Sequence, residues 1–417
     1  MRGGLEVADV FRKGETQFRE QFGHTLRPEQ RQVIRAITSC RTAELGGHKQ
    51  ECTDCGHRRI QYNSCRNRHC PKCQALARAN WLEVRQSELL PIPYFHVVFT
   101  LPEQLRHLAL QNQRVIYSIL FRAAAETLQE LANDPKHLGA KIGILAVLHS
   151  WGQNLMFHPH VHCIVTGGGI APGGTQWIHC KRSRRRGKDF FVHVRILSRV
   201  FRGKFIGLLK QAYGNGELQL YGTLTPLREP ATFEHLLNTS VKKDWVVYAK
   251  RPFGGPEQVL KYLARYTHRV AISNHRLVQQ RGETVSFRYK DYADGQKSKV
   301  MTLSNAEFIR RFLMHTLPSR FVRIRYYGFL ANRYRKQHIA HCRELLGVPP
   351  ATEVAPTEEA AHANEETDEV VSPKTCPACG RKSLVNRGTV LSTSERLAQR
   401  PHFLRCREEI NKWHDTS

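Results

Sequence analysis

The strongest local pattern in this chain of 417 residues is a pair of short cysteine motifs. Cys52 and Cys55 form one Cys-x-x-Cys pair, Cys70 and Cys73 form another, and fourteen residues separate the two. Each pair supplies two thiolates from a tight turn, and four thiolates suffice for closed tetrahedral zinc coordination. The spacing therefore predicts a small zinc-binding fold near the N-terminus, against the alternatives of chance pairing or a redox pair.

Further metal-ligating residues lie in and around this region. A second zinc ion, interleaved with the first, has four candidate ligands: Cys40, His48, Cys65 and His69. This assignment stays open, because His57 could take part and the liganding pairs could be permuted between the two sites. Near the other end, "CPACG" at 376–380 resembles half a zinc ribbon that His402 and Cys406 could complete, or else an unmetallated turn. The chain has twelve cysteines and no signal-peptide pattern, so metal ligation and free thiols are expected rather than disulfides.

The charge of the chain is strongly positive and unevenly placed. Lys and Arg number 64 against 36 Asp and Glu, a net charge of +28, and residues 1–343 carry a net +31. Such an excess predicts a polyanionic partner. No apolar run approaches the roughly 18 residues of a membrane span, so we expect a cytoplasmic, nucleoid-associated protein with no membrane partner.

Three histidines lie within five positions of the stretch "FHPHVHCIVTGGG", residues 157–169. In a strand, His160 and His162 project to one face and offer a bidentate platform for a cation, whereas half-buried histidines without metal are the plainer alternative. His158 is expected just outside the regular strand, because Pro159 cannot donate to a ladder. Mg²⁺ or Mn²⁺ then needs a third ligand, for which Gln153 is the first choice and His149 the second.

Two tyrosines four residues apart lie in "VLKYLARYTHRV". On a helix, Tyr262 and Tyr266 share one face; they either belong to a packing stripe or act together in chemistry. A phenol needs help to act as a nucleophile at neutral pH, and a cation that polarises a phosphate supplies it. Attack on DNA by tyrosine would leave a 5′-phosphotyrosine link and a free 3′ hydroxyl, so rejoining needs no ATP.

The combination of "HPHVHCIVTGGG", "YLARYTHRVAISNHRL" and "LPSRFVRIRYYGFLANRYR" resembles the two-tyrosine HUH rolling-circle transposases of bacterial insertion sequences. The resemblance covers roughly residues 20–340, and the cysteine array is similar to the zinc-binding domain of that family. It implies an α+β fold with a ferredoxin-like antiparallel sheet, His160 and His162 as the metal ligands on a central strand, and Tyr262 and Tyr266 as paired nucleophiles on a nearby helix.

This reading predicts four regions. They are a helical and zinc-binding DNA-binding domain at 1–92, a catalytic domain at 93–345, an acidic disordered linker at 346–373 and a tail at 374–417. The expected partner is single-stranded and hairpin DNA at the element ends and the target, and the oligomeric state stays open. Basic residues expected to contact DNA are Arg182, Arg184, Arg185, Arg186, Arg265 and Arg269.

Two other functions remain open at this point. A plasmid replication initiator or relaxase would use the same chemistry in another process. A non-catalytic zinc-containing DNA-binding regulator would need neither tyrosine. No phosphate-binding Walker loop is present, which argues against a fused helicase.

Overall fold

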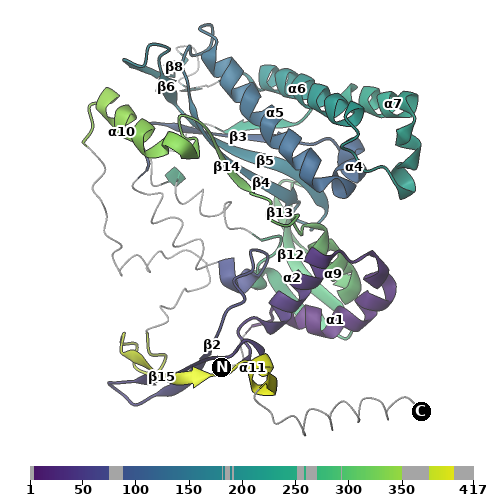
Figure 1. Ribbon diagram of the computed structural model, residues 1–417, viewed down its shortest axis with the longest axis vertical. Coiled ribbons are helices and arrows are strands. Elements are labelled where there is room, and N and C mark those ends of the chain that lie inside the picture. The colour runs from purple at the N-terminus through teal and green to yellow at the C-terminus, as the bar shows by residue number, and fades with distance from the viewer. Residues whose placement is uncertain are drawn as a thin grey trace.

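The computed structural model describes residues 4–74, 88–180, 182–183, 188–189, 192–250, 258–259, 270–292, 294–349 and 375–398. The protein is a mixed α+β structure with antiparallel sheets (Figure 1). Among the described residues, no helix has both the length and the apolar character needed to cross a membrane.

A five-stranded antiparallel sheet forms the centre of the larger body. Its spatial order is β10-β3-β5-β4-β14, so β5 is the central strand. The strands are β3 (Tyr94–Thr100), β4 (Gly143–Trp151), β5 (Phe157–Thr166), β10 (Val247–Lys250) and β14 (Ile324–Gly328). The segments "YFHVVFTLP", "GILAVLHS" and "HVHCIVTG" have the β-branched and apolar composition typical of strands, and they form β3, β4 and β5, of which the last two pair as neighbours.

Helices cover one face of this sheet (Figure 1). They are α4 (Arg106–Gln111), α5 (Gln113–Asn133), α6 (Val194–Gly214) and α7 (Pro230–Val241). Helices α4 and α5 are separated at Asn112, whose side chain accepts a hydrogen bond from the main-chain N–H of Gln219 at 2.7 Å and donates one to the Gln219 carbonyl at 3.0 Å. Alternate residues of a strand face the same side of the sheet, and the apolar residues Phe99, Val161 and Leu148 all point toward the helices. These side chains and those of the helices form the core.

The other face of the sheet carries a smaller buried cluster. Helix α10 (Arg335–Leu345) contributes Ile339 and Cys342 to it, beside Val147 of β4 and Ile164 of β5. Two short strand pairs follow β5 in the chain: β6 (Gly168–Ile170) with β7 (Trp177–His179), and β8 (Arg182–Ser183) with β9 (Lys188–Asp189). Strands β8 and β9 pair antiparallel within the basic run that follows Cys180.

A second body combines the N-terminal helices with a segment from the middle of the chain (Figure 1). Its elements are α1 (Val7–Phe22), α2 (Pro28–Ser39), α9 (Asn305–Met314) and a sheet of β11 (Leu277–Arg281), β12 (Thr284–Asp291) and β13 (Lys297–Ser304). Pro28 begins α2, and the Ser304 hydroxyl caps α9 by accepting from the N–H of Glu307, which are the positions that proline and serine favour at a helix N-terminus.

The domain boundary expected at residue 92 does not match the structure, in which segments from both sides of it share one core. Phe11 of α1 packs edge-on against Phe312 of α9, with ring centroids 5.3 Å apart. One hydrophobic cluster contains residues of both segments, so residues 7–40 and 271–313 fold together. Distant segments of a chain share a core when each leaves an apolar face that only the other covers.

The C-terminal segment returns to the N-terminal region (Figure 1). Strand β15 (Leu384–Val390), followed by α11 (Thr393–Ala398), pairs antiparallel with β1 (Gly47–Cys52), which also pairs with β2 (Arg58–Tyr62). The tail expected at 374–417 is thus not separate in its described part, because β15 forms one edge of an N-terminal sheet. Short 3₁₀ turns occur at Gly23–Thr25, Ala43–Leu45, Glu103–Leu105, Gly222–Arg228, Asn274–Arg276 and Asn332–Tyr334.

Candidate metal centre and zinc clusters

Three histidines from two neighbouring strands come together at the sheet. His149 of β4 lies directly opposite His160 of β5, and His162 follows two positions later on the same face. Their ligand nitrogens all lie within 4.8 Å of one another. The ring centroids of His160 and His162 are 4.8 Å apart, and those of His149 and His162 are 4.6 Å apart. This spacing allows the three imidazoles to share one cation.

The start of β5 differs from the prediction. His158 and Pro159 lie inside the strand, which begins at Phe157. The ladder to β4 shifts register here, since His149 faces His160 whereas Trp151 faces Phe157. This irregularity accommodates a proline that cannot donate a ladder hydrogen bond. The ring of His158 is 5.4 Å from that of His160 but does not belong to the group formed by His149, His160 and His162.

Hydrogen bonds orient two of the three rings. Nδ1 of His160 lies 2.7 Å from the carbonyl oxygen of His158, and Nδ1 of His162 lies 2.9 Å from Nε2 of His96. When Nδ1 carries the proton in each ring, the lone pair resides on Nε2, the nitrogen that a metal would take. The carbonyl oxygen of His158 accepts the proton of His160 Nδ1 and so sets the tautomer of that ring, and the contact with His96 orients the ring of His162.

The third candidate ligand in the structure is His149. It is buried, and its ring stacks on Trp151 at a centroid distance of 4.7 Å. Gln153, the first choice from the sequence, lies in the turn between β4 and β5, where its main-chain carbonyl accepts a hydrogen bond from Arg276. The cross-strand register explains the difference: pairing His149 with His160 puts both imidazoles on one face.

The predicted nucleophiles lie outside the described residues. Tyr262 and Tyr266 fall in the gap at 260–269, together with Arg265 and Arg269. Arg184, Arg185 and Arg186 also lie outside, and only the backbone of Arg182 is described. Val259, three residues before Tyr262, is described and fully buried. It belongs to the cluster that contains Leu145, Val147 and Ile164, on the histidine face of the sheet.

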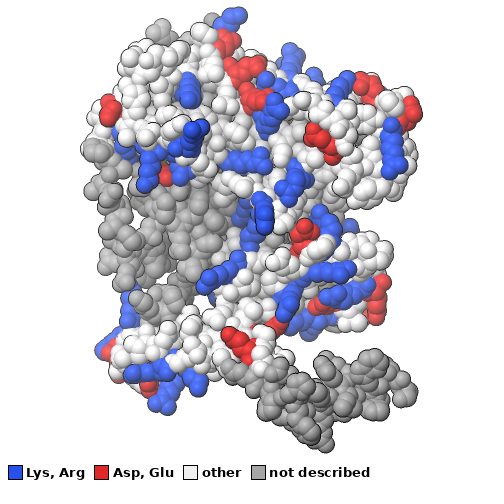
Figure 2. Space-filling view, in the orientation of Figure 1, with Lys and Arg blue, Asp and Glu red and all other residues white. Residues whose placement is uncertain are grey.

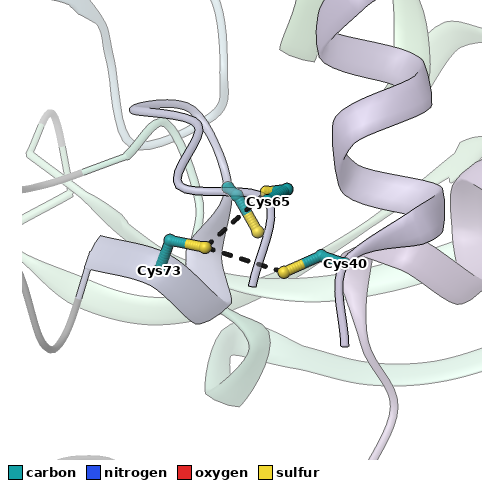
Figure 3. A group of neighbouring side chains, drawn as sticks. Cys40, Cys65 and Cys73 are labelled. Atoms are coloured by element: carbon teal, nitrogen blue, oxygen red, sulfur yellow. Dashed lines mark hydrogen bonds between the residues drawn. The ribbon is translucent and has the colours of Figure 1, made fainter. Parts of the chain in front are cut away.

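A cluster of four cysteines lies near the end of α2 (Figure 3). Its members are Cys40, Cys65, Cys70 and Cys73. Sγ of Cys73 lies 3.6 Å from Sγ of Cys40 and 3.6 Å from Sγ of Cys65. Four sulfurs bound to zinc at 2.3 Å in a tetrahedron are about 3.8 Å apart. A disulfide requires about 2.05 Å, so the spacing fits a zinc site and excludes disulfides in this structure.

This grouping corrects the pairing predicted from the sequence. The pairs Cys52/Cys55 and Cys70/Cys73 do not share a site, because Cys52 and Cys55 group with Cys376 and Cys379 instead. His48 and His69 belong to none of the metal-ligating groups found among the described residues. His69 is partly buried, and desolvation lowers the pKa of its imidazole to about 3; its Nε2 accepts a hydrogen bond from the N–H of Leu317 at 3.4 Å. His402 and Cys406 lie outside the described residues.

The described surface is rich in cations. Figure 2 shows Lys and Arg covering more of the visible face than Asp and Glu, in line with the net charge of +28. Some arginines serve the fold, such as Arg68, whose guanidinium donates to the carbonyls of Pro318 and Phe321. Others stack on aromatic rings, such as Arg325, whose guanidinium carbon is 4.5 Å from the ring centre of Phe121. The surface thus suits a polyanion.

Comparison with known proteins decides the family. A family model described as "Putative transposase" matches residues 143–338, and one described as "Transposase zinc-binding domain" matches residues 10–101. "Putative transposase y4qJ" of Sinorhizobium fredii (strain NBRC 101917 / NGR234) is 55% identical over 388 residues, which cover 92% of this chain and 95% of the relative. The chain belongs to this family of transposases.

A second relative supports the same membership. "Transposase for insertion sequence element IS801" of Pseudomonas savastanoi pv. phaseolicola is 30% identical over 368 residues, which cover 86% of this chain and 83% of the relative. No solved structure matches the chain. In this transposase, the segment that matches the zinc-binding domain model runs from α1 to β3 and includes Cys40, Cys65, Cys70 and Cys73. The segment that matches the "Putative transposase" model includes all three histidines of the candidate metal site.

His96, whose imidazole contacts His162, is a residue of the site that the sequence alone did not identify. His96 is 2% exposed in β3 and contacts His162, whereas the rest of "YFHVVFT" has the apolar and aromatic composition of a buried strand. A histidine inside such a strand signals a polar partner, because a buried imidazole needs a hydrogen bond. The partner itself depends on strand pairing, which the local sequence does not specify.

Proposed function

We propose that this transposase cuts and rejoins single-stranded DNA through 5′-phosphotyrosine links, with Tyr262 and Tyr266 as nucleophiles beside a divalent cation. The observation that carries the proposal is the group of three imidazoles on the face of the central sheet. A divalent cation bound there would neutralise a scissile phosphate and stabilise the leaving 3′ oxygen.

The topology of the sheet supports an HUH core. The chain order β3-α5-β4-β5-α6-β10 and the spatial order β10-β3-β5-β4 correspond to a split β-α-β arrangement of the ferredoxin-like type, with β14 added at one edge. His160 and His162 lie on the central strand β5, as the resemblance to HUH transposases implies. We therefore infer that the sheet, α5 and α6 form the catalytic core.

The position of Val259 supports the role of the tyrosines. Its side chain is buried with residues of the histidine face, Val147 and Ile164 among them. The chain at Val259, three residues before Tyr262, therefore lies on the side of the sheet that carries the imidazoles.

The donor set supports Mn²⁺ as the better cation. Three neutral imidazoles suit first-row transition ions, whereas Mg²⁺ prefers oxygen ligands and retains its waters. His160 and His162 would bind through Nε2, oriented by their Nδ1 contacts, and His149 would complete the site. Coordination by these residues leaves positions for oxygen atoms of the DNA phosphate.

The reaction conserves phosphodiester bonds. A tyrosine oxygen bonds to phosphorus as the bond from phosphorus to the 3′ oxygen breaks, and that oxygen takes up a proton. A second tyrosine can then hold another cleaved end while the first link is resolved by a 3′ hydroxyl. Each step exchanges one phosphoester for another, so the cycle requires no nucleotide triphosphate.

The proposal is tested with a labelled single-stranded oligonucleotide from an element end, incubated with protein and Mn²⁺. We expect an adduct that resists denaturant and is absent from the double variant Tyr262→Phe, Tyr266→Phe. Tyr292→Phe is the matched control, because Tyr292 is 66% exposed on the second body of the molecule. An adduct of equal yield in the double variant would refute the roles given to the tyrosines.

A further inference from the structure

Two turns far apart in the chain have the same sequence pattern and backbone conformation. Cys52-Thr-Asp-Cys55-Gly56 and Cys376-Pro-Ala-Cys379-Gly380 both read Cys-x-x-Cys-Gly. The glycines have φ of +69° and +73°, which place them in the left-handed region that glycine adopts without strain. The repeated pattern points to one structural task carried out by both turns.

Equivalent hydrogen bonds confirm the likeness of the two turns. The N–H of Gly56 donates to the carbonyl of Cys52, and that of Gly380 to the carbonyl of Cys376, both at 2.9 Å. The N–H of Cys52 donates to the carbonyl of His57 at 2.9 Å, and that of Cys376 to the carbonyl of Arg381 at 2.7 Å. Each turn thus presents two thiols on the same backbone scaffold.

The four thiols of the two turns face one another. Sγ of Cys52 lies 3.7 Å from Sγ of Cys379, and Sγ of Cys55 lies 3.6 Å from Sγ of Cys376. These separations are close to the roughly 3.8 Å edge of a zinc–thiolate tetrahedron and far above the length of a disulfide. All four sulfurs lie within 4.8 Å of one another.

Strand pairing holds the two turns in register. Leu384 of β15 is opposite Cys52 of β1, and the N–H of Thr53 donates to the carbonyl of Ser383 at 3.0 Å. The buried core at this junction is small, because the hydrophobic cluster there consists of Cys52, Cys376 and Leu384. So small a core rarely stabilises a fold by itself, and a structural metal is a common supplement.

We propose that Cys52, Cys55, Cys376 and Cys379 bind one structural zinc ion that ties the C-terminal segment 375–398 to the N-terminal sheet. Two of these ligands lie far beyond residues 10–101, the range of the matched zinc-binding domain. The site is therefore a second zinc centre, separate from the cluster around Cys40, and it links the two ends of the chain. It does not depend on the proposed tyrosine chemistry.

Alkylation of the unmodified protein tests the site without any substitution. Cys55 and Cys379 are exposed, so as free thiols they would react readily with a maleimide. We expect mass spectrometry to find both protected in the zinc-loaded protein and both modified after chelation. Modification before chelation would overturn the proposal. Protection that survives chelation but ends on reduction would also overturn it, because it would indicate disulfides.

Zinc content provides a second test. The double variant Cys376→Ser, Cys379→Ser should contain one zinc equivalent less than the parent, whereas Cys180→Ser, which changes a cysteine outside both clusters, should retain the parental content. The double variant Cys40→Ser, Cys65→Ser should lose a different equivalent and leave Cys55 and Cys379 protected from alkylation. Unchanged zinc in the Cys376, Cys379 variant would contradict the proposal.

Cleavage of the chain tests the structural link directly. A protease site inserted after Pro356 allows the full-length protein to be cut between the body and the C-terminal segment. We expect the two pieces to co-elute in gel filtration with zinc and to separate after chelation. Separation while zinc remains bound to the body, or co-elution after complete removal of zinc, would overturn the proposed zinc tie.

Discussion

Nε2 of His96 lies 2.9 Å from Nδ1 of His162, and the two rings are nearly parallel, with centroids 5.1 Å apart and planes 6° apart. His96 is on β3 and is 2% exposed, so water does not compete for this contact. The contact holds the His162 ring with its other nitrogen available to the histidine group. His96 is thus a positioning residue for a candidate ligand.

Removing this contact should weaken metal binding. We expect His96→Ala to lower the affinity for Mn²⁺ by about 10- to 100-fold, because the His162 ring loses the partner that orients it. Calorimetric titration with Mn²⁺ measures the effect. His107→Ala, a change at an exposed histidine of α4, should leave the affinity unchanged. A folded His96→Ala variant with parental affinity would show that the contact has no role in ligation.

The third ligand can be identified by comparing two substitutions. His149→Ala removes an imidazole whose ligand nitrogen lies within 4.8 Å of those of His160 and His162, so Mn²⁺ binding should fall sharply. Gln153→Ala should have a much smaller effect, because the contact of Gln153 with Arg276 is made by its main-chain carbonyl. The same titration, with thermal unfolding as a check on folding, distinguishes them. The reverse ranking would favour Gln153 as the ligand.

The shared core of the N-terminal helices and α9 predicts a sensitive glycine. A Cβ added at Gly14 would lie 2.5 Å from Cβ of Asn305, so Gly14→Ala should destabilise the protein by about 1–3 kcal/mol. Gly207 on α6 has open space around it, and Gly207→Ala should stabilise by about 0.5–1 kcal/mol. Denaturant unfolding measures both. If the two substitutions changed the free energy of unfolding equally, the result would contradict the close packing of α1 on α9.

Burial of His315 predicts a loss of stability in acid. Desolvation lowers the pKa of its imidazole from 6.5 to about 4, although the bond to the carbonyl of Leu155 opposes the shift. Between these pH values the unfolded chain binds the extra proton, so the free energy of unfolding should fall as pH drops from 6.5 to 4. The loss is up to about 3 kcal/mol.

Below pH 4 both states are protonated at this residue, and its contribution should become constant. Urea unfolding across pH 4 to 7 measures the trend, and His315→Gln should show a shallower fall because an amide does not titrate. Parallel curves for the parent and the variant would mean that His315 does not contribute the acid sensitivity.

Local patterns predicted elements well where one residue type determines the backbone. Pro28 begins α2, Ser304 caps α9, and the alternation in 143–166 produces the strands β4 and β5. The candidate metal site was predicted in part, since His160 and His162 share a face by strand geometry alone. His149 ranked only second from the sequence, because its position opposite His160 depends on the register between strands.

The cysteine sites show why spacing alone was insufficient. A Cys-x-x-Cys pair indicates two thiolates in one turn but not which other pair completes the site. Cys55 joins Cys376 because β15 pairs with β1, a contact between residues more than 300 positions apart. The glycine after each pair was the missed signal: Gly56 and Gly380 mark two turns of one kind, whereas Cys73 is followed by Gln74.

Mapping the covalent adduct is the most direct test of the central claim that a tyrosine beside the histidine group attacks DNA. The oligonucleotide adduct formed with Mn²⁺ would be digested with protease and nuclease, and the modified peptide sequenced by mass spectrometry. We predict a phosphonucleotide on Tyr262 or Tyr266, and none when His160 and His162 are both replaced by alanine. A modified residue outside the segment 260–269, or an adduct that persists without the two histidines, would contradict the account.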